Sequence, residues 1–264
     1  MSSSNNRSLN GATVLVTRPE GQGDALCQLI EAAGGRAVSF PVMVIQPLDD
    51  ADTRRRLQSA LAGCDTVIFV SRNAVYWARE LLPDPAADLA GRIICAAGAA
   101  TRRELQNAGI SDVVHTESTR ASEDLLARPE LAADRVAGRQ VLIVRGEGGR
   151  ELLTEELQKR GATVQRLAIY RRVLPQVAPD KIRSLWHDRK PDVIVITSVT
   201  GLYNLVELTP EACRPVLFAT PLAVISERIR KAAEEAGFTV KPVVAASASD
   251  PELVRAVIAC TESV

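Results

Sequence analysis

Apolar and polar residues alternate along the chain in a pattern that recurs at about half its length. Residues 141–144 form a short apolar run rich in β-branched side chains, which is typical of a buried parallel strand. A polar turn with glycines follows, and then an amphipathic helix that ends at Gly161. Residues 14–43 show the same order of features, with Gly34 in the place of Gly161 (161 − 34 = 127). The chain is therefore expected to be an internal duplication.

Strand and helix patterns alternate through both copies. The predicted strands are residues 14–17, 66–70, 93–96, 113–114, 141–144, 193–196, 223–225 and 243–245. The main predicted helices are residues 24–33, 53–61, 100–108, 122–131, 179–186, 199–208, 227–236 and 250 to the end. Asn73 and Ser122 are expected to be N-caps. Strands separated by helices predict βαβ units and parallel sheets, with enough strands in each copy for a flavodoxin-like doubly wound α/β domain.

The domain boundaries have two interpretations. Extended segments at residues 40–46 and 167–175 occupy equivalent places in the two copies, and prolines mark both. If both are linkers, domain one is discontinuous (residues 1–39 and 176–264) and domain two covers residues 47–166. The alternative is two sequential domains that divide near residues 134–138. Periodicity alone does not separate these arrangements.

Composition narrows the class of protein. The chain has 46% hydrophobic residues, which is enough for a proper core, and its 32 basic residues equal its 32 acidic residues. Zero net charge argues against a general nucleic-acid binder. Arginine far outnumbers lysine, which suits recognition of carboxylates or phosphates, although a GC-rich genome produces the same bias. The five scattered cysteines indicate a reducing compartment, and we expect a cytoplasmic protein without a signal peptide or a membrane span.

Several common cofactor-binding and catalytic motifs are incomplete or missing in this sequence. Gly146-x-Gly148 lacks the third glycine of a dinucleotide-binding loop, and the chain has neither a Gly-Lys pair for a P-loop nor a G-x-S-x-G elbow. The two histidines, His115 and His187, have no second ligand at metal-binding spacing. We therefore expect no metal, nicotinamide, flavin or nucleotide cofactor.

Polar and small residues gather instead at the predicted carboxyl ends of the strands, where open parallel sheets bind ligands. The candidate binding residues are Arg18, Ser71, Arg72, Asn73, Gly98, Ser122, Arg145, Thr197, Ser198, Ser226 and Ser247. Helix N-termini at these places attract anions. We expect the two sets to line a cleft between the domains that holds a polyanionic ligand. The simpler interpretation is that the hydroxyl residues only cap helices and the arginines are solvated.

Five motifs in order give the chain a family resemblance. They are TRPEGQ at 17–22, VIFVSRNAV at 67–75, VLIVRGEGGRELLTEELQKRGATV at 141–164, AIYRR at 168–172 and ITSVTGLYNL at 196–205. The set resembles the uroporphyrinogen-III synthase family. The resemblance implies two flavodoxin-like domains joined by a two-stranded linker, which favours the discontinuous arrangement.

The same resemblance implies a cofactor-free monomeric enzyme, a hydro-lyase that cyclises hydroxymethylbilane to uroporphyrinogen III with inversion of ring D and loss of water. Tyr170 matches the tyrosine proposed in the family as the general acid at the departing hydroxyl. The substrate carries eight carboxylates, which suits the donors at the strand ends. The alternative is a two-lobed, non-enzymatic module that binds a small anion.

Overall fold

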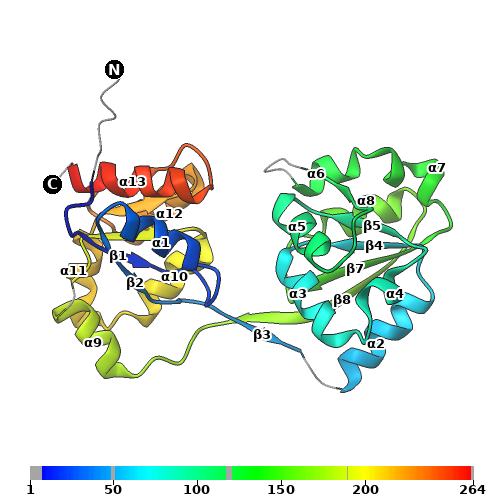
Figure 1. Cartoon of the computed structure of the whole chain (residues 1–264), viewed down its shortest axis with the longest axis horizontal. Helices are drawn as coiled ribbons and strands as arrows, with labels where there is room; N and C mark the ends of the chain where they lie inside the picture. Colours follow the sequence, from blue (N-terminus) through cyan, green and yellow to red (C-terminus); the bar gives the residue numbers. More distant parts are fainter. Residues whose placement is uncertain (1–7, 49–50, 117–120, 189, 263–264) are drawn as a thin grey trace. The chain divides into compact units, whose positions relative to one another are not determined.

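The computed structural model describes residues 8–48, 51–116, 121–188 and 190–262. The chain divides into two compact units (Figure 1). Unit 1 consists of Met1–Val44 and Val173–Val264, and unit 2 consists of Ile45–Arg172. Both units have a sheet of parallel strand pairs with helices on its two faces, so the α/β class predicted from the sequence is confirmed.

The sheet of unit 1 has five strands in the order β11-β10-β9-β1-β2. Their bounds are β1 Thr13–Val16, β2 Arg36–Ser39, β9 Val193–Ile196, β10 Leu222–Val224 and β11 Val243–Val244. In β1, Val14 and Val16 face one core cluster while Leu15 faces the other. Because both faces are covered, the central strands β9 and β10 are apolar at every position instead of alternating with polar residues.

Two groups of helices cover this sheet. One face packs against α1 (Asp24–Ala32) and α13 (Asp250–Glu262). The other face packs against α9 (Pro179–His187), α10 (Val199–Leu208), η2 (Glu211–Cys213), α11 (Arg214–Ala219) and α12 (Glu227–Ala236). The short α11 and η2 carry no clear periodicity in the sequence, and they were not predicted.

The sheet of unit 2 has six strands in the order β3-β8-β7-β4-β5-β6. Their bounds are β3 Val44–Pro47, β4 Thr66–Phe69, β5 Ile93–Ala96, β6 Val114–His115, β7 Gln140–Gly146 and β8 Thr163–Val173. One face packs against α2 (Ala51–Ala62), α3 (Arg72–Leu81), α4 (Pro85–Leu89) and α5 (Ala99–Asn107). The opposite face packs against α6 (Ala121–Leu126), η1 (Pro129–Leu131), α7 (Ala133–Val136) and α8 (Leu152–Lys159).

The pairing of β7 with β8 contains a bulge. Arg145 pairs with Ala168, but Gly146 pairs with Tyr170, so Ile169 is an extra residue on β8. Ile169 and Tyr170 are consecutive and both buried, whereas successive residues of a regular strand point to opposite faces. The bulge therefore turns Tyr170 into the interior of unit 2 near the carboxyl end of β7.

Two predicted helix caps are wrong. Ser71, not Asn73, is the N-cap of α3, because its backbone is extended and its hydroxyl accepts a hydrogen bond from the Ala74 N–H at 3.1 Å. Asn73 lies within the first turn of that helix. Ser122 likewise lies inside α6 and does not precede it.

The cysteines give a prediction about thiol reactivity. All five are free thiols, and burial raises the pKa of Cys95 and of Cys260 to about 12. Because the thiolate is the reactive form, we expect both to resist iodoacetamide at pH 8 in the native protein and to react after denaturation. Half-buried Cys64 is the internal control, and peptide mass spectrometry measures the labelling. Labelling of Cys95 as fast as Cys64 would contradict the buried position.

No helix within the four described ranges is long and apolar enough to cross a membrane.

Candidate functional site

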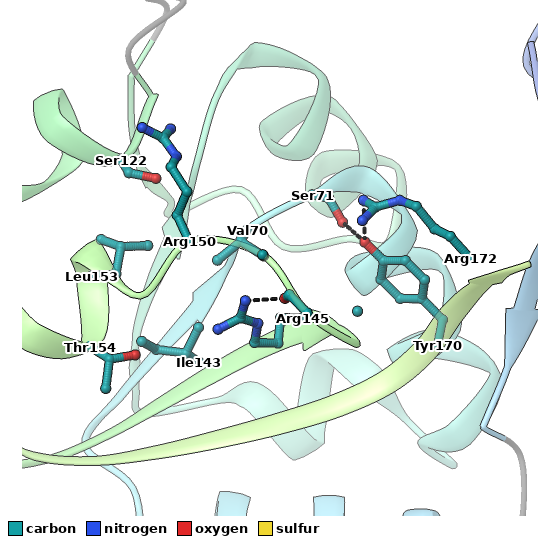
Figure 2. Close-up of a pocket in the computed structure, with 13 residues that line it drawn as sticks. Val70, Ser71, Ser122, Ile143, Arg145, Arg150, Leu153, Thr154, Tyr170 and Arg172 are labelled. Carbon is teal, nitrogen blue, oxygen red and sulfur yellow. Dashed lines mark hydrogen bonds between the residues drawn. The ribbon is translucent and has the colours of Figure 1, made fainter. Parts of the chain in front are cut away.

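The carboxyl ends of β4 and β7 border a cavity in unit 2. Its volume is about 200 Å³. Figure 2 shows its lining, which includes the predicted residues Ser71, Ser122, Arg145 and Tyr170 together with Arg150 and Arg172. Four predicted residues from four separate parts of the sequence therefore meet in one place.

The hydroxyl of Tyr170 is the centre of a small polar group in this cavity. It lies 2.9 Å from the Ser71 Oγ, and the Arg172 Nη2 donates to it at 3.2 Å (Figure 2). The Arg172 guanidinium carbon also lies 5.5 Å from the centre of the phenol ring, within range for a cation–π contact. Tyr170 is only 1% exposed, so the ring is fixed while its hydroxyl is held by two polar groups.

Gly146 makes room for the Tyr170 ring. A Cβ atom at Gly146 would lie 2.5 Å from the Tyr170 Cε2 and 2.6 Å from its Cζ. Real Cβ atoms do not approach other atoms so closely, and the buried ring has little space to move away. The glycine is therefore required by the close approach of the tyrosine.

Arg145 is buried and bonded to its own loop. Its guanidinium donates to the Gly148 carbonyl oxygen and, at 3.2 Å, to Glu151. It also lies against Gly149, whose φ of +97° favours glycine and where a Cβ would come 2.7 Å from the Arg145 Nη2. In this structure Arg145 shapes the loop between β7 and α8, and its role as a substrate contact stays a prediction.

Glu151 joins Arg145 to Arg166. Partial burial opposes its ionisation, but hydrogen bonding to Arg166 and the charges of both arginines outweigh it and lower the pKa of Glu151. A lowered pKa means that this ion pair stabilises the loop above the ordinary value of 4.5 and that the contribution is lost as the pH falls through the lowered value.

The other predicted residues of unit 2 lie at neighbouring helix starts. Arg72 and Asn73 are half-buried in the first turn of α3. Gly98 is the N-cap of α5 with a φ of +96°, a conformation that favours glycine. These three residues follow β4 and β5, which are adjacent in the sheet.

The predicted residues of unit 1 follow four neighbouring strands. Arg18, after β1, forms a 2.7 Å ion pair with Asp250 at the start of α13. Ser198 and Ser226 cap α10 and α12 by accepting the N–H groups of Gly201 and Ile229. Thr197 is half-buried beside Ser198, and the exposed Ser247 lies 2.9 Å from the Ser249 hydroxyl. Ser198 and Ser226 therefore have the capping role, and ligand contact by them stays a prediction.

Sequence reasoning missed Arg172, Gly146 and Arg150. In the sequence, Arg172 stood out only as part of the AIYRR motif. The one local signal for the bulge in β8 was the apolar pair Ile169-Tyr170. Within the described part of the chain, His, Cys, Asp and Glu side chains form no group of three or more that could hold a metal ion.

Comparisons with known proteins agree with this arrangement. The sequence model of the family described as uroporphyrinogen-III synthase HemD matches residues 24–255. The uroporphyrinogen-III synthase of Salmonella typhimurium is 34% identical over 229 residues, which cover 86% of this chain and 92% of the relative. The Escherichia coli uroporphyrinogen-III synthase is 30% identical over 237 residues with the same coverage of both chains.

Solved structures show the same fold. The structure of uroporphyrinogen-III synthetase from Helicobacter pylori has a TM-score of 0.61 at 14% identity, covering 94% of this chain and 99% of that one. A mutant uroporphyrinogen III synthase from Thermus thermophilus has a TM-score of 0.60 at 19% identity, covering 96% and 100%. These identities support the fold alone, while the family match and the closer sequences carry the assignment. The chain belongs to the uroporphyrinogen-III synthase family.

Proposed function

We propose that the protein is a hydro-lyase that converts the linear tetrapyrrole hydroxymethylbilane into uroporphyrinogen III, with inversion of ring D and loss of water. The family match over residues 24–255 carries this proposal. The fixed phenol of Tyr170 in a cavity at the carboxyl ends of the strands supports it, because loss of water needs a proton donor at the departing hydroxyl.

This reaction requires the protein mainly to control the conformation of the bound substrate. Loss of the hydroxyl leaves an electrophilic azafulvene on ring A, which ring D attacks through its substituted carbon to give a spiro intermediate. That intermediate fragments and closes again with ring D inverted. Direct closure gives the other isomer without help, so the enzyme has to hold one conformer and exclude the other.

The substrate carboxylates are proposed to bind the donors at the strand ends of both units. In unit 2 these are Ser71, Arg72, Asn73, Gly98, Ser122 and Arg145, and in unit 1 they are Arg18, Thr197, Ser198, Ser226 and Ser247. Free N–H groups at the starts of α3, α5, α10 and α12 suit anions as well. With no net charge on the chain, attraction has to come from local groups of this kind.

The two units are proposed to be flavodoxin-like domains that arose by duplication. Read from β2, the order in unit 1 is β2-β1-β9-β10-β11, and the equivalent strands of unit 2 follow as β8-β7-β4-β5-β6. Ser71 and Ser198, at equivalent positions, cap α3 and α10 in the same way. The unit boundaries after Val44 and Arg172 fall inside the predicted linkers, residues 40–46 and 167–175. We also propose that the protein works as a cytoplasmic monomer, which the five free thiols suit.

Product analysis tests the proposed reaction. The protein is incubated with freshly made hydroxymethylbilane, the products are oxidised to porphyrins, and isomers I and III are separated by chromatography. We expect isomer III to dominate. A ratio of isomers equal to that of the sample without protein would refute the proposal, and stoichiometric binding without turnover would favour a binding module.

Replacing Tyr170 with phenylalanine tests the proposed acid. The ring and its packing are kept, so we expect a folded protein whose turnover falls about tenfold, less than the typical ~10²–10⁴ contribution of a general acid because the substrate is already reactive. Tyr76→Phe and Tyr203→Phe are matched controls, since both side chains are 47% exposed. Unchanged turnover in Tyr170→Phe would remove Tyr170 from the mechanism.

A further inference from the structure

Two hydroxyl residues, Ser71 and Tyr170, line the cavity side by side. Tyr170 is 1% exposed, and its ring lies against Gly146. Ser71 is only half-buried, lines the same cavity, and has its Oγ 2.9 Å from the phenol oxygen (Figure 2). Ser71 is therefore the more accessible of the two hydroxyl groups to a ligand in the cavity.

The neighbouring donors set the direction of the protons. Arg172 donates to the phenol oxygen, so the O–H of Tyr170 is directed to another acceptor, and Ser71 Oγ lies within range. Ser71 Oγ already accepts the N–H of Ala74 as the cap of α3. With a second proton arriving from Tyr170, the serine keeps its own O–H to donate into the cavity.

Arg172 is suited to the charge that such a transfer leaves behind. Of the three arginines that line the cavity, Arg145 is paired with Glu151 and Arg150 is paired with Glu123 at 2.8 Å. The Arg172 guanidinium is bonded to the phenol oxygen. A phenolate at this position would face this guanidinium and accept a charge-assisted hydrogen bond from it.

We propose that Ser71 is the catalytic residue that delivers the proton to the substrate hydroxyl, that Tyr170 resupplies Ser71, and that Arg172 is a positioning residue for Tyr170. This inference rests on the proposed function and specifies its proton path.

Each proton and electron pair in this step has a defined destination. The Ser71 O–H proton passes to the substrate hydroxyl oxygen, the C–O bond breaks, and its electron pair leaves with water. Electrons of the pyrrole ring form a double bond to the carbon that lost oxygen, giving the protonated azafulvene. The Tyr170 proton moves to Ser71 Oγ, so the serine is neutral again and a phenolate remains beside Arg172. When ring D finally closes the macrocycle through its unsubstituted α-carbon, that carbon loses a proton. The proton returns to the phenolate and restores the phenol of Tyr170.

A double-mutant cycle tests the coupling between the two hydroxyls. The single-turnover rate of uroporphyrinogen III formation is measured for wild type, Ser71→Ala, Tyr170→Phe and the double variant. Two members of one relay act as a unit, so we expect all three variants to be slowed by about tenfold, whereas independent contributions would multiply to about a hundredfold in the double variant. Multiplied losses would overturn the relay.

Controls separate the relay from the structural role of Ser71. Ser71→Thr keeps a hydroxyl and is expected to restore most of the rate. Asp84→Ala removes a cap in the same unit, since Asp84 Oδ1 accepts the Ala87 N–H at 3.1 Å at the start of α4, and it is expected to keep the wild-type rate. If Asp84→Ala is slowed as much as Ser71→Ala, loss of a cap explains the effect and the relay is wrong.

The number of protons that move in the step that removes the substrate hydroxyl shows which residue faces the substrate. The single-turnover rate is measured in mixtures of H₂O and D₂O. Transfer through Ser71 moves two protons, so the rate of the wild type should depend on the deuterium fraction along a curve, and that of Ser71→Ala along a straighter line. A linear dependence in the wild type would make Tyr170 the direct donor and refute delivery by Ser71.

Arg172→Gln tests the positioning role. If Arg172 acts through Tyr170, the variant lowers kcat about fivefold at constant KM in the wild-type background and changes nothing further in Tyr170→Phe. Arg171→Gln is the matched control, because the neighbouring Arg171 is exposed like Arg172 but bonds to Gln46 instead of Tyr170. A raised KM in both backgrounds would instead make Arg172 a carboxylate contact. Failure of the wild type to form isomer III would refute the proposed function, which is a different result from any of these.

Discussion

Alanine in place of Gly146 is expected to slow the single-turnover rate by about tenfold, as loss of the Tyr170 hydroxyl does, and to lower the free energy of unfolding by about 2 kcal/mol. The new Cβ would lie 2.5 Å from the Tyr170 ring, and the backbone of Gly146 is not in the left-handed region, so the effect is steric. Because the ring is fully enclosed, it has to shift, and its hydroxyl then leaves both Ser71 and Arg172.

Gly63→Ala is the matched control for that result. Gly63 lies in the same unit and is exposed, and a Cβ atom added there would meet no other atom within 4 Å. We expect its rate and its urea midpoint to match those of the wild type. If Gly146→Ala also keeps the wild-type rate in rapid-quench measurements, the position of the tyrosine is not critical for the reaction.

Arg145→Ala is expected to destabilise unit 2 by about 2–3 kcal/mol, which is the cost typical of losing hydrogen bonds to a charged group. The change leaves the Gly148 carbonyl without the guanidinium and breaks the ion pair of Arg145 with Glu151. Urea unfolding followed by circular dichroism measures the loss. We expect turnover to fall as well, because this loop borders the cavity.

The control for Arg145 is Arg139→Ala. Arg139 also forms an ion pair in unit 2, with Asp65 at 3.0 Å, but its side chain is 61% exposed. Exposed pairs contribute about 0–1 kcal/mol, so this variant should be nearly as stable as the wild type. Equal destabilisation by the two substitutions would show that burial of Arg145 is not what matters.

The parts of the fold that depend on local pattern could be predicted from the sequence. Residues 67–70 and 193–196 are apolar at every position because both faces of their sheets are covered, and this signal can be recognised without knowing the partner strands. The short α4 and α7 were missed, because helices of five and four residues are too short to show a period and depend on packing.

The candidate site could be predicted only as a set of positions. Strand ends are visible in the sequence, so Ser71 and Arg145 were found there, and Tyr170 was found through the family resemblance, but their meeting depends on the bulge in β8. A bulge is defined by the partner strand, and no local pattern gives that register. The choice of Ser71 over Asn73 as cap also needed the structure, since both residue types cap helices well.

The position of β1 has a consequence for how the chain is made. This strand is synthesised long before β9, yet in the sheet it lies between β2 and β9, and β9 begins only at Val193. Unit 2 is contiguous and emerges whole before β9 is synthesised. The segment from β1 to β2 must therefore wait during translation with the β9-facing edge of β1 unpaired, and we expect this exposed strand edge to need protection from aggregation.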